Sequence, residues 1–234
     1  MSRRARLASL SFLMVVVTGC ATTTVTQRET YQGERLPRPE RIVVYDFAAS
    51  AADIPPGSQA QPYSMPSTPP TSDELALGRQ VGTQVAQELV AQIQNMGLPA
   101  VRAASQPAPR PGDIVIMGYF ESVDPGSLTK RVALGFGAGA AELRTVVEGY
   151  QMTNRGLRRL GSGNIESAGG KGPGSAFPLA LAIATGNPIG IAVSSAAKIQ
   201  GEVSGRTTIE GAARRTATEI ADQLRPAFQR QGWI

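Results

Sequence analysis

The sequence contains no histidine and only one cysteine, Cys20. Without histidine, the chain lacks the general base of Ser-His-Asp and Cys-His catalysis and the commonest zinc ligand. Its carboxylates are scattered and form no calcium loop of the DxDxDG kind. We therefore predict no catalytic residue and no metal site. A hydrolase built on a Ser-Lys pair stays open, because Lys130, Lys171 and Lys198 occur in a chain that also has serines.

The glycine-rich stretches lack the complete motifs that hold a nucleotide phosphate. Gly135-Phe-Gly137-Ala-Gly139 is followed by Ala140, where a GxGxxG motif needs its final glycine. The pair Gly170-Lys171 resembles the end of a P-loop, but Gly172 replaces the required serine or threonine. We predict no cofactor.

The longest apolar run near the N-terminus is short. It covers 11 residues, Leu7 to Val17, and follows the positive residues Arg3, Arg4 and Arg6. As a helix with a rise of about 1.5 Å per residue, such a run cannot cross a bilayer core of about 30 Å. Residues 1–19 are therefore predicted to be a secretory signal peptide.

The signal ends in Val17, Thr18, Gly19 and Cys20, which resembles the lipobox of bacterial lipoproteins. The alternative is an ordinary cleavage site beside an incidental cysteine. The resemblance implies a diacylglyceryl group and an N-acyl chain, such as palmitate, on Cys20, and two or more chains anchor a protein stably. Ala21 follows the cysteine, and by the same resemblance this favours the outer membrane, facing the periplasm.

Cleavage before Cys20 lowers the formal net charge from +5 to +2, because three arginines leave with the signal. Two arginine doublets remain, at 158–159 and 214–215. They either contact phosphates or anionic headgroups or are simply solvated, and we favour the second interpretation. Export makes nucleic acid an implausible partner. With Cys20 modified, no disulfide forms within the mature chain.

The mature chain is predicted to have one folded domain behind a tether. Residues 20–40 are polar and are predicted to form a flexible, lipidated tether, and residues 41–234 a single domain. Within the domain, 48–72 contains six prolines and is predicted to be an insertion without a helix or central strand. It is either disordered or a functional loop, and we favour disorder.

Sequence patterns predict strands over 42–47, 113–123 and 144–152, with a weaker one over 157–166. A capping box, Thr71-x-x-Glu74, predicts a helix that ends at Gly97. A second box, Thr207-x-x-Glu210, predicts a helix that Pro226 kinks or ends. The sum is an α+β fold, with a small, mainly antiparallel sheet and two longer helices on one face. The alternative is a split β-α-β arrangement with some parallel pairing.

Residues 175–199 hold two apolar stretches of about ten residues around Gly186-Asn187-Pro188, each too short to span a membrane as a helix. They are either buried core or a surface for self-association or for an envelope partner. Asp46, Asp113 and Asp124 are expected to cap helices or close turns rather than to act as acids.

Several motifs resemble the bacterial envelope family known as domain of unknown function 4410. They are Gly118, 124–127 (DPGS), Lys130-Arg131, 135–139 (GFGAG), Glu142-Leu143, 186–188 (GNP), 201–205 (GEVSG) and 231–233 (QGW). The resemblance covers most of residues 40–233. It implies an exported, often lipidated protein and supplies no catalytic residue.

The sequence therefore predicts a membrane-anchored envelope lipoprotein that is not an enzyme and that binds another envelope component or builds an assembly. One alternative is an enzyme of unfamiliar type that acts on cell-wall or lipid material, which a deep pocket lined by Lys130, Arg131 and carboxylates would favour. The other is a carrier of a small ligand or lipid. An enclosed apolar cavity would favour the carrier.

Overall fold

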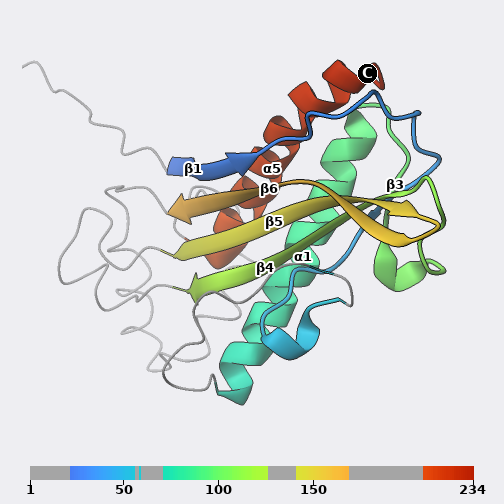
Figure 1. Ribbon diagram of the computed structural model, residues 1–234. Coiled ribbons are helices and arrows are strands. Elements are labelled where there is room, and N and C mark those ends of the chain that lie inside the picture. The colour runs from blue at the N-terminus through green and yellow to red at the C-terminus, as the bar shows by residue number, and fades with distance from the viewer. Residues whose placement is uncertain (1–21, 56–57, 59–70, 126–140, 169–207) are drawn as a thin grey trace, which may run out of the picture.

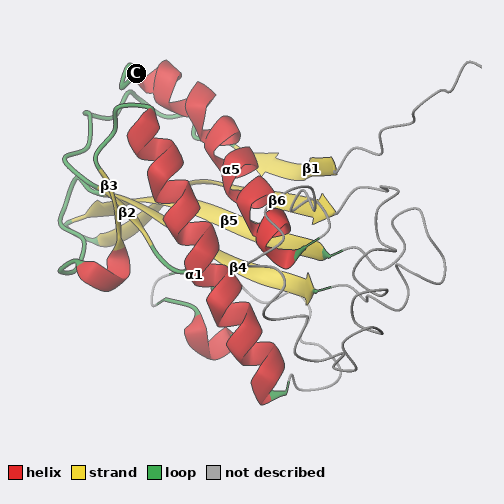
Figure 2. Ribbon diagram, turned by 180° about the vertical axis from the view of Figure 1, so that it is seen from behind, coloured by secondary structure: helices red, strands yellow, loops and turns green. Residues whose placement is uncertain are grey.

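The computed structural model describes residues 22–55, 58, 71–125, 141–168 and 208–234. These residues form one six-stranded sheet, and the two long helices α1 and α5 pack together across one of its faces (Figures 1 and 2). The predicted α+β fold is confirmed. No helix of the described residues is long and apolar enough to span a membrane.

The sheet is mixed rather than mainly antiparallel. Its strand order is β1-β6-β5-β4-β2-β3. The strands are β1 (Thr22–Glu29), β2 (Ile42–Val44), β3 (Ala100–Arg102), β4 (Ile114–Asp124), β5 (Glu142–Thr153) and β6 (Gly156–Ala168). The long strands β4, β5, β6 and β1 pair antiparallel, whereas β2 pairs parallel with both β4 and β3. The parallel pairing arises because α1 carries the chain back between β2 and β3.

Helix α1 (Ser72–Asn95) begins and ends where the sequence predicts. The Thr71 hydroxyl accepts from the Glu74 backbone N–H, and the Glu74 carboxylate accepts from the Thr71 backbone N–H. At the other end, Gly97 adopts a left-handed conformation with φ of 81°. The stripe of Val81, Val85, Leu89 and Ile93 is fully enclosed by the sheet and α5, so the helix belongs to the core.

Helix α5 (Ile209–Gln231) differs from the prediction in its N-cap. Its N-cap is Thr208, not Thr207, and the Thr208 hydroxyl accepts from the Gly211 backbone N–H at 3.1 Å. Pro226 lies inside the helix and does not end it. The last turn is held by tertiary contacts, since Phe228 is buried and packs against Trp233 with ring centroids 5.5 Å apart. Packing therefore outweighs the hydrogen bond that the proline removes.

Residues 22–29 form strand β1 instead of part of the flexible tether that their polar composition predicts. The strand carries four threonines and a valine, all β-branched, and it pairs with β6 along nearly its whole length. The chain after it is also packed, because Leu36 is buried in the main core. The domain therefore starts about twenty residues earlier than predicted.

The predicted insertion at 48–72 is folded at its beginning. Ala48 is buried and forms a parallel bridge with Tyr119, and a short 3-10 helix covers Ala51–Asp53. Most of the remaining prolines lie outside the described residues, as do the glycine-rich stretch at 126–140 and the apolar stretches within 175–199.

Candidate functional site

The predicted anchor residues, Val17, Thr18, Gly19 and Cys20, lie outside the described residues. The same holds for Lys130 and Arg131, which the enzyme alternative would place in a pocket, and for Lys171 and Lys198 of the Ser-Lys alternative. The described residues therefore do not include the side chains on which these two predictions depend.

Two of the three singled-out aspartates are held in ion pairs. The Asp113 carboxylate is nearly enclosed, accepts from Arg41 Nε at 3.1 Å and closes a turn by accepting from the Arg110 backbone N–H at 2.8 Å. Asp46 pairs with Arg102 at 2.7 Å and accepts from the Thr83 hydroxyl at 2.9 Å. Asp124 is the last residue of β4. The turn-closing role is confirmed for Asp113, whereas Asp46 joins β2 to β3.

The two residues of the 158–159 arginine doublet are engaged on opposite sides of β6. Arg158 donates to Gln151 and lies 5.6 Å from the ring centroid of Tyr31. Arg159 pairs with Glu29 at 3.0 Å and donates to the Ser162 hydroxyl at 2.7 Å. Arg158 is nevertheless exposed, and about a third of the Arg159 side chain is accessible, so the interpretation of a solvated doublet stays a prediction.

The two residues of the 214–215 doublet also have different surroundings. Arg214 is mostly exposed and lies 3.7 Å from Glu88 of α1. Arg215 is half-buried, and burial lowers the pKa of its guanidinium. Its Nε and Nη2 atoms are buried and have no hydrogen-bond partner among the described residues.

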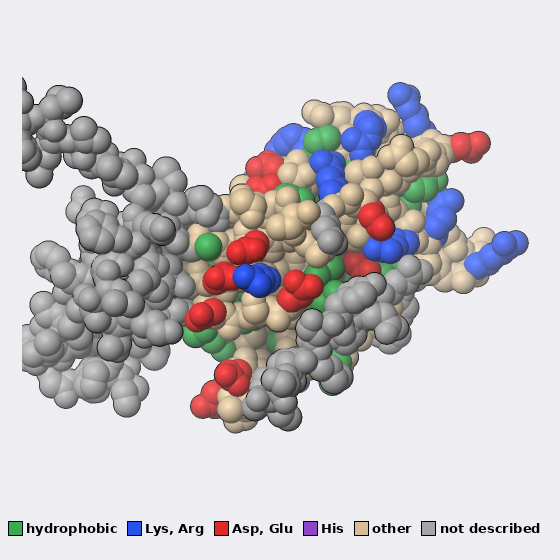
Figure 3. Space-filling view, turned by 60° about the vertical axis from the view of Figure 1, so that its left-hand side comes forward, with side chains coloured by type: hydrophobic (Ala, Val, Ile, Leu, Met, Phe, Trp, Pro, Cys, Tyr) green, Lys and Arg blue, Asp and Glu red, His purple; other side chains and the backbone are tan. Residues whose placement is uncertain are grey.

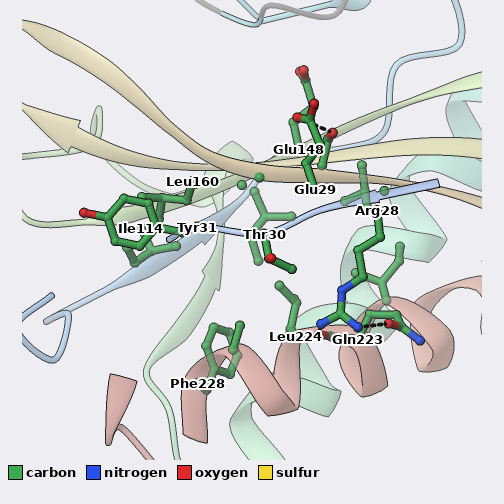
Figure 4. Close-up of a pocket in the computed structure, with 18 of the residues that line it drawn as sticks. Arg28, Glu29, Thr30, Tyr31, Ile114, Glu148, Leu160, Gln223, Leu224 and Phe228 are labelled. Carbon is green, nitrogen blue, oxygen red and sulfur yellow. Dashed lines mark hydrogen bonds between the residues drawn. The ribbon is translucent and has the colours of Figure 1, made fainter. Parts of the chain in front are cut away.

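A cavity lies between α5 and the helix-covered face of the sheet, under the chain that leaves β1. We call it the α5 cavity; its volume is about 140 Å³ (Figure 4). Apolar side chains from three layers line it: Val25, Tyr31 and Leu36 from the N-terminal segment, Ile114, Ile116, Val147, Leu160 and Ile165 from the sheet, and Ile220, Leu224, Ala227, Phe228 and Trp233 from α5 and the residues after it.

Three glycines of the sheet line this cavity. Gly149 of β5 and Gly161 and Gly163 of β6 line the cavity, and cross-strand pairing joins Gly149 to Gly161 and Val147 to Gly163. A Cβ atom built on Gly149 would meet no atom within 4 Å. At Gly161 a Cβ atom would lie 2.4 Å from the carbonyl oxygen of Glu29, so glycine is required there for the close approach of β1. Open space is left by the missing side chain at Gly149, whereas Gly161 lets β1 pack closely against β6.

The polar groups of the site gather at its rim. Arg28 Nη1 donates to Gln223 Oε1 at 2.8 Å, and Nη2 donates to the Gln223 carbonyl at 3.3 Å. In Figure 4 this pair lies to one side of the apolar lining, whereas Glu29 and Glu148 lie on the far side of the strands. Those two carboxylates both lie near Arg159, at 3.0 and 4.0 Å. Arg28 appears in none of the ion pairs between described residues, and its two described hydrogen bonds go to the neutral Gln223.

The opposite end of the cavity is closed by the C-terminus. Trp233 Nε1 donates to the Leu36 carbonyl at 3.1 Å, and Gln231 Oε1 accepts from the Leu36 backbone N–H at 2.6 Å. Among the described residues, no three acidic or thiol side chains lie close enough to hold a metal ion.

Sequence reasoning did not find this site. The signal was present in Gly149, Gly161 and Gly163, which occupy inward positions of two strands.

The sequence pattern of one family, described as Domain of unknown function (DUF4410), matches residues 42–186. The chain belongs to this family. The match confirms the resemblance seen in the sequence, although it begins after β1 and ends before α5.

No curated protein matches the chain. Among solved structures, the chain is similar to the PelC dodecamer from Paraburkholderia phytofirmans, with 17% identity, a TM-score of 0.37, and coverage of 73% of this chain and 95% of that chain. It is also similar to a single-substitution variant of that dodecamer from the same organism, with 16% identity, a TM-score of 0.35, and coverage of 73% and 94%. TM-scores this low do not establish a common fold.

Proposed function

We propose that this protein is a lipid-anchored, non-catalytic binding protein of the cell envelope, and that the α5 cavity holds the apolar part of a small anionic ligand. The observation that carries the proposal is the cavity itself. A cavity of about 140 Å³ with a mainly apolar lining compares with engineered apolar cavities of about 150 Å³, which bind benzene. The ligand would therefore have an apolar group of about that size.

Arg28 supports a negative charge on the ligand. Its guanidinium lies at the rim and, within the part of the chain that the structure describes, donates to the neutral side chain and the carbonyl of Gln223. A carboxylate arriving at the rim would place an opposite charge beside the guanidinium and can accept two parallel N–H bonds from it, which the neutral amide of Gln223 cannot match. The proposed ligand class is a carboxylate with one benzene-sized aromatic or short aliphatic group.

The chemistry of the lining favours binding over catalysis. Glu29 and Glu148 share Arg159, and the Ser58 hydroxyl also donates to Glu148 at 2.7 Å. A general acid or base must reach the substrate directly or through one water, and these carboxylates are held by other partners on the opposite side of the strands. The lining instead suits the carrier alternative raised by the sequence.

The proposal of a lipid anchor rests on the sequence alone. Cys20, preceded by Val17, Thr18 and Gly19, would carry the lipid, and Ala21 favours the outer membrane facing the periplasm. An N-acyl chain in addition to a diacylglyceryl group would hold the protein firmly, so no other membrane signal is required.

Calorimetric titration of the full mature chain carrying Cys20→Ser tests the binding proposal. Benzoate, benzyl alcohol and benzylamine share one ring and differ in charge, and affinity should fall in that order. Arg28→Gln should weaken benzoate binding roughly tenfold and leave benzyl alcohol unaffected, since one charge-assisted hydrogen bond contributes about 1.5 kcal/mol.

Gly149→Val should abolish binding of both benzoate and benzyl alcohol, because its side chain grows into the cavity. Ser122→Val, on the exposed part of β4, is the matched control and should bind like the wild type. If Gly149→Val is folded and still binds benzoate as tightly as the control, the ligand is elsewhere and the proposal fails.

A further inference from the structure

We propose that the end of the sheet where β1 begins is the membrane-proximal end of the domain. This inference rests on the lipid anchor at Cys20, which belongs to the proposed function. It goes further by assigning the face of the fold that meets the lipid surface.

The distance from the anchor to the fold is short. Strand β1 starts at Thr22, two residues after Cys20. Two residues of extended chain reach at most about 7 Å. A flexible tether of twenty residues would leave the orientation of the domain free, but an ordered β1 leaves almost no slack.

The register of the sheet brings three other strand ends to the same level. Thr22 pairs with Ala168, Ala168 with Glu142, and Glu142 with Asp124. Neighbouring strands lie about 4.8 Å apart, so Asp124 is only about 14 Å across the sheet from Thr22. Figure 1 shows the start of β1 and the ends of β6 and β4 on one side of the molecule. These four residues define the anchor end.

The opposite end of the fold lies far from this row. The β5–β6 hairpin pairs Thr153 with Gly156, eleven residues along β5 from Glu142, or about 36 Å at 3.3 Å per residue. Helix α5 runs the same way: the Thr216 hydroxyl contacts that of Ser167 near the anchor end, and Trp233 lies 17 residues later, roughly 25 Å along a helix.

The described side chains at the anchor end carry mixed charge. Arg144 lies between Glu142, at 2.9 Å, and Glu166, at 3.8 Å. Figure 3, with this side turned towards the viewer, shows several acidic side chains around one basic side chain. Attraction to anionic lipid requires clustered lysine or arginine, and the described residues around Arg144 form no such cluster.

The orientation constrains how the α5 cavity is filled. Arg28, at the cavity rim, is six residues along β1 from Thr22, or about 20 Å. This places the rim outside the headgroup layer when the anchor end faces the lipid. The ligand would therefore enter from the aqueous compartment rather than directly from the bilayer, which agrees with a small, charged ligand.

Energy transfer from Trp233, the chain's single tryptophan, tests the orientation without altering the donor. The purified mature chain is coupled through the Cys20 thiol to maleimide lipid in vesicles that contain a dansyl-labelled headgroup lipid. The comparison protein carries Cys20→Ser and Asn154→Cys, and is coupled through the exposed hairpin. Both must give the same far-ultraviolet circular dichroism spectrum.

Transfer from Trp233 should be several-fold weaker when Cys20 is the attachment point than when residue 154 is. Equal transfer, or stronger transfer through Cys20, would overturn the orientation. Because the coupling is chemical, this outcome does not depend on lipidation in the cell. Failure of the cellular anchor would appear separately, as absence of labelled palmitate on the wild-type protein.

Discussion

The indole Nε1 of Trp233 donates a hydrogen bond of 3.1 Å to the carbonyl oxygen of Leu36, and so ties the last residues of the chain to the segment that follows β1. Both residues are buried and both line the α5 cavity. The contact therefore joins the end of helix α5 to the N-terminal segment of the cavity lining. That segment leads back through β1 to the proposed lipid anchor at Cys20.

Trp233→Phe should destabilise the domain by about 1–3 kcal/mol, because the Leu36 carbonyl would be left buried without its donor. Urea unfolding followed by circular dichroism measures the change. Ile234→Ala is the neighbouring control. Ile234 is exposed, so its loss should change stability by no more than about 0.5 kcal/mol. Similar effects of the two substitutions would argue against the Trp233–Leu36 contact.

The sequence predicted the parts of the fold that local patterns specify. The Thr71–Glu74 box, the apolar stripe of α1 and left-handed Gly97 lie within a single segment, and each is where it was predicted. Strands β4, β5 and β6 also show local β-branched or alternating patterns.

The features that the sequence missed depend on distant partners. Strand β1 is polar and becomes ordered by pairing with β6, as in the contact of Thr23 with Ser167, 144 residues away. The cavity needs Gly149 and Gly161 to be cross-strand neighbours, and one sequence does not give that register. Pro226 is tolerated because Phe228 and Trp233 hold the end of α5, which is again a tertiary effect.

The Arg41–Asp113 pair should contribute strongly to stability because the Asp113 carboxylate is nearly enclosed. Arg41→Met should cost about 3 kcal/mol or more, since it leaves a buried charge without its partner. Arg79→Met removes the partner of Asp53 in a more exposed pair and should cost at most about 1 kcal/mol. Chemical denaturation of both variants checks the difference, and equal losses would contradict the burial-based argument.

Glu74 gives a pH dependence with a defined sign. The backbone N–H and hydroxyl of Thr71 both donate to its carboxylate and hold its pKa below the ordinary value of 4.5. The charged form therefore stabilises the folded state fully above pH 4.5, and this contribution is lost as the pH falls through the lowered pKa.

The melting temperatures of the wild type and Glu74→Gln should therefore differ most near neutral pH and converge in acid. Glutamine keeps a hydrogen-bond acceptor at the position and removes only the charge. Glu40→Gln, on an exposed loop residue, matches the change in net charge. A gap between wild type and Glu74→Gln that widens below pH 4 would show that the carboxylate does not act through its charged form.

Cys20→Ser should abolish labelled-palmitate incorporation and release the protein from the membrane fraction, because serine has no thiol to carry the thioether-linked lipid that would hold the chain at the membrane. Membrane fractionation followed by a carbonate wash makes the comparison. A Cys20→Ser protein that stays with the washed membranes would disprove attachment through this one residue.

The most direct test of the binding account is nuclear magnetic resonance of the mature chain, Cys20→Ser, under xenon, because xenon enters accessible apolar cavities whatever the natural ligand. The account predicts concentration-dependent shifts concentrated at Ile116, Val147 and Leu224, which line the cavity, and loss of those shifts in Gly149→Val. Absence of shifts at these residues, or shifts centred on Val115 and Tyr150 on the opposite face of the sheet, would contradict it.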